Sequence, residues 1–201
     1  RNRLARDLHD DMGSTLSTIN ILSNMALQQE SLDPGKNKQY LDTISKSTHQ
    51  MMEAMDDIVW SINPVNDSMA KIIARMKETA GTVLEPAQIE YRFEVDPDVP
   101  DLHLAMEVRR EIFLIFKEAL NNIVKYAGCS MVIFKFSKKA PDLVLTISDN
   151  GTGFETSAAG SATRGNGLRN MQHRAANAGG KLVVTSQPGT GTSIGLSVPI
   201  A

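Results

Sequence analysis

A chain of 201 residues is long enough for one large domain or two small ones. Its formal net charge of -2, from 21 basic and 23 acidic residues, argues against nucleic acid or an anionic membrane as the main partner. The single cysteine, Cys129, excludes an internal disulfide and fits a reducing compartment.

No apolar run approaches the roughly 18 residues that predict a membrane-spanning helix. No signal peptide is visible, and the chain opens on Arg1 rather than on methionine. We therefore expect a soluble piece of a longer protein, so the missing membrane segment says nothing about the parent.

Apolar residues at alternating steps of three and four predict two helices in the first third of the chain. The first should span residues 1 to about 30 and the second about 37 to 62. Asp33-Pro34-Gly35 predicts the turn between them, and Pro64 should end the second helix. The expected seam residues are Ala5, Leu8, Met12, Thr15, Ile19, Leu22 and Ala26 on the first helix, and Leu41, Ile44, Thr48, Met51, Met55, Ile58 and Ile62 on the second.

Two antiparallel helices alone leave apolar surface on their outer sides. A second copy would cover that surface by closing a four-helix bundle, so we predict a homodimer. The alternative is a monomeric hairpin packed on the second domain.

The rest of the chain predicts strands interleaved with helices, mostly without parallel crossovers, which indicates an α+β sandwich. Asn66-Asp67-Ser68 should cap a helix that runs to about Leu84. The domain break falls near Pro64, which gives domains of residues 1–64 and 65–201. The other expected elements are a strand over 89–95, a helix over 104–127, strands over 131–136 and 143–148, a helix over 168–178, and a hairpin of 182–185 and 193–198.

Polar residues on the helix expected over 104–127 suggest a magnesium and phosphate site. Glu118, Asn122 and Lys125 are spaced i, i+4, i+7 and should share one helix face. An acid, an amide oxygen and an ammonium on one face suit a partly hydrated magnesium ion and phosphate oxygens. The alternative is a solvated polar stripe on an amphipathic helix.

A second pattern begins at Asp149, which ends an apolar strand. A carboxylate there can accept a hydrogen bond from an exocyclic amine such as that of adenine, and Gly151 and Gly153 let the backbone approach a ligand. The third pattern, residues 165–168 (GNGL), opens a helix whose free amides would favour phosphate. DNG alone is also a common turn signal, and a lone GxG before a helix is a weak signal as well.

In this order and spacing the segments KEALNNIVKYA, DNGTGF and GNGLRNM, closed by PGTGT, resemble the ATPase fold shared by histidine kinases, gyrase, heat-shock chaperones and mismatch-repair ATPases. The resemblance implies ATP and Mg²⁺ as ligands, with Asn122 and Glu118 at the metal and Asp149 at the adenine amine. It makes residues 155–164 a mobile lid. The other implied ATP-binding residues are Lys125, Tyr126, Gly151, Gly153, Gly165, Gly167, Leu168 and Thr192. The family motif usually continues Lys-His, so Tyr126 would be a retuned contact.

His9, on the first helix, is followed at once by Asp10. A neutral imidazole keeps a lone pair for attack, and a carboxylate on its other nitrogen would hold the tautomer and stabilise the cation. Adjacent helix residues point about 100° apart, so Asp10 must reach sideways, and Asp11 is the alternative. The remaining histidines, His49, His103 and His173, are expected to be structural or exposed.

RLARDLHDDMGSTLS resembles the phosphoacceptor box of the histidine-kinase class typified by nitrate-responsive and membrane-fluidity sensors, and MDDIVWSINP recurs in similar sensors. The resemblance covers nearly the whole chain. It implies a sensor kinase core that autophosphorylates His9 from ATP and passes the phosphate to an aspartate of a response regulator with a helix-turn-helix output domain, without touching DNA itself.

The same resemblance implies a parent protein anchored in the bacterial inner membrane. The family carries glutamine where this chain has Ser14, so kinase action is better supported than phosphatase action. Two alternatives stay open: an ATPase clamp of the gyrase or chaperone type, and a catalytically silent dimerisation scaffold.

Overall fold

The computed structural model of the chain describes residues 2–28, 34–155 and 166–200. The chain divides into two compact units, Arg1–Ile62 and Asn63–Ala201. None of the helices in the described ranges is long and apolar enough to cross a membrane. The assignment of the two units to separate functions stays a prediction.

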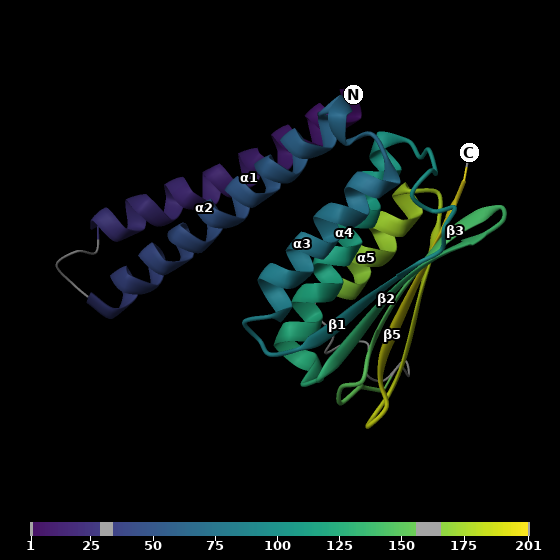
Figure 1. Cartoon of the computed structure of the whole chain (residues 1–201). Helices are drawn as coiled ribbons and strands as arrows, with labels where there is room; N and C mark the ends of the chain where they lie inside the picture. Colours follow the sequence, from purple (N-terminus) through teal and green to yellow (C-terminus); the bar gives the residue numbers. More distant parts are fainter. Residues whose placement is uncertain (1, 29–33, 156–165, 201) are drawn as a thin grey trace. The chain divides into compact units, whose positions relative to one another are not determined.

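The first unit is a pair of helices, α1 (Asn2–Gln28) and α2 (Pro34–Ile62), which lie side by side (Figure 1). The predicted helix pair is confirmed, but the turn predicted at Asp33-Pro34-Gly35 is wrong for Pro34 and Gly35, which belong to the first turn of α2. Proline is tolerated there because the first helical residues have no intrahelical partner for their N–H groups. Asp33 lies outside the described residues.

The predicted seams differ in outcome between the two helices. On α1 the described seam residues Thr15, Ile19, Leu22 and Ala26 are half-buried or buried, whereas Leu27 is 73% exposed. On α2 the predicted seam consists of two rows, each with a spacing of seven residues. The row Ile44, Met51 and Ile58 is half-buried or buried, and the row Leu41, Thr48 and Met55 is exposed. Alternating steps of three and four describe two adjacent rows, and a single neighbouring helix does not cover both.

The second unit is a two-layer α/β sandwich. Its sheet has the order β1-β2-β3-β5-β4, and helices α3, α4 and α5 lie on one face of it (Figure 1). β1 and β2 are parallel and joined through α4, and every other neighbouring pair is antiparallel. The predicted α+β class is confirmed. The elements are α3 (Met69–Leu84), β1 (Glu90–Val95), α4 (Met106–Asn122), β2 (Met131–Lys139), β3 (Asp142–Asp149), α5 (Asn166–Asn177), β4 (Lys181–Gln187) and β5 (Gly191–Pro199).

The core of this unit lies between the helices and the sheet. Phe116 of α4 is fully buried and its ring lies 5.2 Å from that of Phe134 on β2. Alternation along β3 places Leu143, Leu145 and Ile147 in the same core. Because Asp149 has the same parity as these residues, the strand ends with a carboxylate on the helix-covered face.

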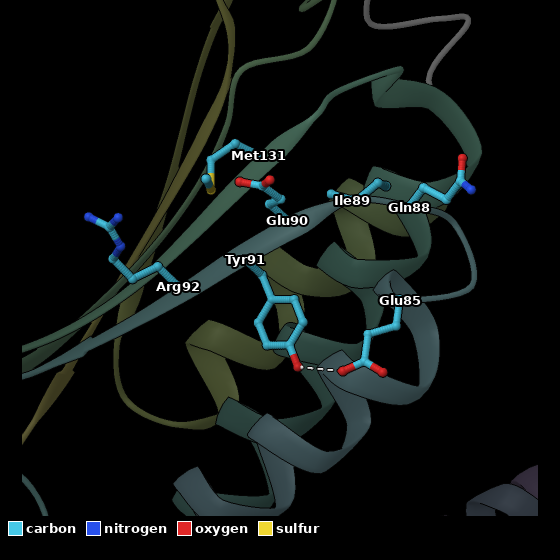
Figure 2. Close-up of a pocket in the computed structure, with 7 residues that line it drawn as sticks. All are labelled: Glu85, Gln88, Ile89, Glu90, Tyr91, Arg92 and Met131. Carbon is cyan, nitrogen blue, oxygen red and sulfur yellow. Dashed lines mark hydrogen bonds between the residues drawn. The ribbon is translucent and has the colours of Figure 1, made fainter.

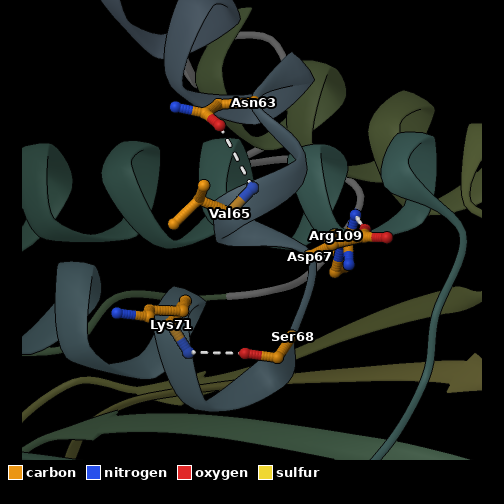
Figure 3. A network of polar contacts seen from close by, with 6 residues as sticks. All are labelled: Asn63, Val65, Asp67, Ser68, Lys71 and Arg109. Atoms are coloured by element: carbon orange, nitrogen blue, oxygen red, sulfur yellow. Dashed lines mark hydrogen bonds and ion pairs between the residues drawn. The ribbon is translucent and has the colours of Figure 1, made fainter.

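Three polar contacts order the segment that leads into α3, and one of them reaches α4 (Figure 3). A short 3₁₀ turn, Pro64–Asn66, follows α2, and Val65 N–H donates to Asn63 Oδ1 at 3.1 Å. Ser68 caps α3 as predicted, accepting from Lys71 N–H at 3.3 Å. Asp67 forms an ion pair with the buried Arg109 of α4, and burial lowers the pKa of that guanidinium.

Candidate functional site

Two of the predicted motifs meet where α5 starts beside α4. Gly167 lies in the first turn of α5, and a Cβ added there would overlap Oε1 of Glu118 and come within 3.6 Å of Nδ2 of Asn122. A side chain at position 167 would therefore displace the Glu118 carboxylate, which is the end of a flexible side chain. A second contact joins α5 to α4 further along both helices: Arg174 Nη1 lies 3.1 Å from Oε2 of the buried Glu111. The start of α5, whose first N–H groups have no partner within the helix, thus faces an acid and an amide.

The predicted helix over 104–127 is one α-helix only as far as Asn122. The next turn, Ile123–Ala127, is a π-helix that ends at Gly128 in the left-handed conformation, with φ of 56°. Since a π turn holds more residues than an α turn, Lys125 does not keep the α-helical i+7 position relative to Glu118 that the sequence predicted. Lys125 and Tyr126 are exposed, Tyr126 by 75%.

This π turn reaches the loop that follows Asp149. The carbonyl oxygen of Ala127 accepts from Thr152 N–H at 2.8 Å, and a Cβ on Gly151 would overlap that same oxygen. Gly151 is therefore required by close packing of two backbones. The contact brings the end of the α4 motif against the start of the Asp149 loop.

The Asp149 carboxylate is held by backbone donors. Its Oδ1 accepts from Gly151 N–H at 2.9 Å and from Thr192 N–H at 3.3 Å. Asp149 and Thr192 are also register partners across β3 and β5. Burial, and to a lesser extent the charge of this carboxylate, raises the pKa of the Cys129 thiol. Oδ1 thus already has two donors, whereas no described residue donates a hydrogen bond to Oδ2, which is the oxygen left for a ligand.

The loop after Asp149 is locked onto the turn between β4 and β5. Gly153 has φ of 59°, and a Cβ there would overlap the carbonyl oxygen of Gln187. Thr152 in turn accepts from Gly189 N–H at 2.6 Å. The DNGTGF and PGTGT segments, which are about forty residues apart in the sequence, thus contact each other beside the carboxylate.

Ser186, at the end of β4, is a site residue that the sequence did not predict. It is 4% exposed, and its hydroxyl contacts Phe154 N, Gly191 O and Thr192 Oγ1, each at 2.9 Å. It is the register partner of Thr192 on β5. The available signal was alternation: Leu182, Val184 and Ser186 share one strand face, so a hydroxyl continues a row of apolar side chains into the interior.

The remaining predicted site residues are not joined to this cluster by the described contacts. Leu168 is half-buried on α5. Gly165 and the lid expected over 155–164 lie outside the described residues, apart from Glu155 at its start. His9 and Asp10 are consecutive residues of α1 in the other unit.

A separate pocket lies elsewhere in the second unit, at the edge strand β1 and the end of α3 (Figure 2). Its volume is about 540 Å³, and it contains none of the predicted site residues. Tyr91 donates to Glu85 Oε1 at 3.1 Å across it, and burial and this contact raise the pKa of the phenol. The polar cluster around Asp149, Glu118 and Gly167 is therefore distinct from the pocket.

The donor set near Gly167 fits a magnesium ion held partly by substrate. Within the described ranges no group of three His, Cys, Asp or Glu side chains is placed to hold a metal. Glu118 and Asn122 offer two oxygen donors on adjacent turns of one helix, and magnesium commonly takes one or two protein oxygens together with phosphate oxygens and water.

The contact between α5 and Glu118 gives a testable expectation. Gly167→Ala should displace the Glu118 carboxylate, a flexible side-chain end, and lower magnesium-dependent nucleotide binding roughly tenfold, the size typical of a disturbed metal surrounding. Binding is measured by calorimetry with and without magnesium. Gly195→Ala is the control, since its added methyl meets nothing nearer than 3.9 Å. Equal binding by both variants would show that Gly167 does not matter to the site.

Each of the two units of the chain matches a known protein family. Residues 1–67 match a family described as "Histidine kinase". Residues 107–201 match a family described as "Histidine kinase-, DNA gyrase B-, and HSP90-like ATPase". The second match contains every residue of the polar cluster, including Ser186.

Curated relatives align along nearly the whole chain. The sensor histidine kinase LiaS of Bacillus subtilis is 27% identical over 200 residues, which is 100% of this chain and 54% of LiaS. The signal transduction histidine-protein kinase/phosphatase UhpB of Salmonella typhimurium is 28% identical over 98% of this chain and 38% of its own length. The chain thus spans about half the length, or less, of these relatives.

The solved structure of the Acinetobacter baumannii histidine kinase AdeS has a similar fold. It is 16% identical in sequence, with a TM-score of 0.61 over 91% of this chain and 95% of that one.

Proposed function

We propose, from the premise that the chain belongs to the sensor histidine kinases of two-component systems, that it transfers the γ-phosphoryl group of ATP to His9 and then to an aspartate of a response regulator. The observation that carries the proposal is that segments around Glu118, Asp149 and Gly167 form contacts within one unit. The other unit matches the histidine-kinase family at the residues around His9.

The nucleotide's base would bind at Asp149. Its free Oδ2 accepts from the exocyclic amine of adenine, while Oδ1 stays with the two backbone donors. The phosphates would lie toward the start of α5, where the free N–H groups and the positive end of the helix dipole favour an anion. Lys125 is exposed and long enough to contact phosphate from the π turn.

Asn122 and Glu118 would hold the magnesium ion that accompanies ATP, and Glu118 would orient a water bound to that ion. When bound, this ion neutralises phosphate charge, which is a large part of catalysis in phosphoryl transfer. The chain's own contribution is to place Asn122 and Glu118 against the start of α5 through Gly167.

His9 would be the nucleophile. One neutral ring nitrogen attacks the γ-phosphorus, the bond to the β-phosphate oxygen breaks, and ADP leaves. Asp10 holds the proton of the other ring nitrogen and offsets the positive charge that forms on the imidazole. The phosphoimidazole then passes its phosphoryl group to the regulator's aspartate.

The helix pair would form a homodimer. Its exposed apolar side chains include Leu16, Ile21, Met25 and Leu27 on α1 and Leu41, Met52, Met55 and Val59 on α2. A second copy that covered apolar side chains of this set would complete a four-helix bundle. We expect a solution mass of twice the 21.9 kDa of one chain by light scattering, and a mass of one chain would contradict the dimer.

By the same family membership, the regulator would carry a helix-turn-helix output domain, and the parent protein would be anchored in the bacterial inner membrane.

The decisive experiment is phosphoryl labelling. The purified chain, incubated with magnesium and γ-labelled ATP, should acquire label that is stable in base and released by acid, as expected of a phosphoimidazole. Release of inorganic phosphate without protein label would indicate an ATPase clamp instead. Absence of nucleotide binding would indicate a silent scaffold.

A further inference from the structure

The buried hydroxyl of Ser186 touches three segments around the Asp149 carboxylate: the loop at Phe154, the turn at Gly191, and Thr192 on the neighbouring strand. We infer that Ser186 is a positioning residue that sets the direction in which the Thr192 hydroxyl donates, and thereby makes the base end of the site select an amino group over a carbonyl. The inference rests on the proposed nucleotide site and adds its base specificity.

The direction follows from counting hydrogens. A serine hydroxyl has one hydrogen to donate and two lone pairs to accept with. Its contact with Gly191 is to a carbonyl oxygen, which only accepts, so the hydrogen of Ser186 goes there. The contact with Phe154 is to an N–H, which only donates. One lone pair is left for the contact of 2.9 Å with Thr192 Oγ1, so Thr192 is the donor of that hydrogen bond.

This arrangement uses up the only hydrogen of the Thr192 hydroxyl. Toward a ligand, Thr192 Oγ1 then presents lone pairs alone. The neighbouring Asp149 carboxylate is also acceptor-only when ionised, and Thr192 N–H is already donated to Asp149 Oδ1. The side chains of both residues therefore accept hydrogen bonds from a base and donate none to it.

The three side chains stand in one row across the sheet. Register pairs Ser186 with Thr192 and Thr192 with Asp149, and all three share the parity of the strand residues that face the helices. Ser186 is buried and Thr192 and Asp149 are half-buried. The buried Ser186 thus sets whether the half-buried Thr192 hydroxyl donates or accepts, although Ser186 itself is not exposed at the site.

An acceptor-only pair favours a base with hydrogens at position 6. Adenine carries an amino group there, whereas hypoxanthine carries a carbonyl oxygen that would face the lone pairs of Asp149 and Thr192. A buried acceptor without a donor costs binding free energy, so the carbonyl base is disfavoured. If the hydrogen of Thr192 were free to rotate, it could donate to that carbonyl.

The test compares ATP with inosine triphosphate, each competing with a fluorescent ATP analogue for the full chain in the presence of magnesium. In Ser186→Ala the hydrogen of the Thr192 hydroxyl is free to turn toward the base. The dissociation constant of inosine triphosphate divided by that of ATP should then fall about tenfold, because one unfavourable contact between two acceptors becomes a hydrogen bond. A structural role alone would weaken both nucleotides by the same factor and leave the ratio unchanged. That result would overturn the inference and leave the proposed function intact.

Ser193→Ala is the matched control. It removes a hydroxyl one residue from Thr192 that instead contacts Ser148 Oγ at 2.9 Å, so the ratio should stay at its wild-type value. If Ser186→Ala does not fold, Thr192→Val replaces it: ATP should weaken while inosine triphosphate does not, and equal weakening overturns the inference. A wild-type chain that binds neither nucleotide overturns the inference and the proposed function together.

Discussion

Asp149→Asn should weaken ATP binding about a hundredfold, in line with the loss of a hydrogen bond to a charged group. The amide oxygen of asparagine can still accept from Gly151 and Thr192 N–H, so the loop keeps its anchor. The amide nitrogen then occupies the position of Oδ2, where its hydrogens face the hydrogens of the adenine amine. The variant replaces an acceptor by a donor with little change of shape.

Calorimetry measures the affinity, and thermal unfolding shows that the fold is kept. Asp142→Asn is the control, because Asp142 starts the same strand at the far end and binds Ser197 Oγ. Wild-type affinity in Asp149→Asn would place the base elsewhere in the unit and remove the basis of the proposed orientation of ATP.

His9→Ala should lower phosphoryl incorporation by a factor of roughly a thousand or more, because it removes the nucleophile itself. ATP affinity should stay at its wild-type value, since Asp149, Asn122 and Glu118 belong to the other unit of the chain. The two measurements together separate loss of chemistry from loss of binding. Acid-labile label per chain and calorimetric affinity are measured on the same preparation.

His49→Ala provides the control on the partner helix. His49 is exposed on α2, and its Nδ1 lies 2.9 Å from Ser45 O in the same helix, so its loss should leave labelling unchanged. Label that persists in His9→Ala, or disappears in His49→Ala, would contradict the assignment of the phosphoacceptor.

Features that depend on neighbouring residues in the chain were predictable. Ser68 caps α3 as expected because an N-cap needs only a short polar side chain three residues before a free N–H. A period of two predicts the strand over 89–95, and β1 spans Glu90–Val95. The error at Pro34 has a local cause as well, because proline is typical of turns and of first helical turns alike.

Other features depend on contacts between distant segments. The π turn at Ile123–Ala127 does not differ from α-helix in composition, and the structure shows its end held by Thr152 N–H on another loop. The exposed row of Leu41, Thr48 and Met55 has the same spacing as the covered row on α2. The spacing predicts that both rows pack against something, but it does not predict which neighbouring element covers which row.

The sequence by itself determined the helix pair, the α+β unit and the types of residue available to the site, because periodicity, caps and glycine turns act over a few residues. Tertiary structure alone decided that Gly167 rests against Glu118 and that Ser186, Thr192 and Asp149 form one row. Strand register and helix packing set those contacts, and both depend on the whole core rather than on any local segment.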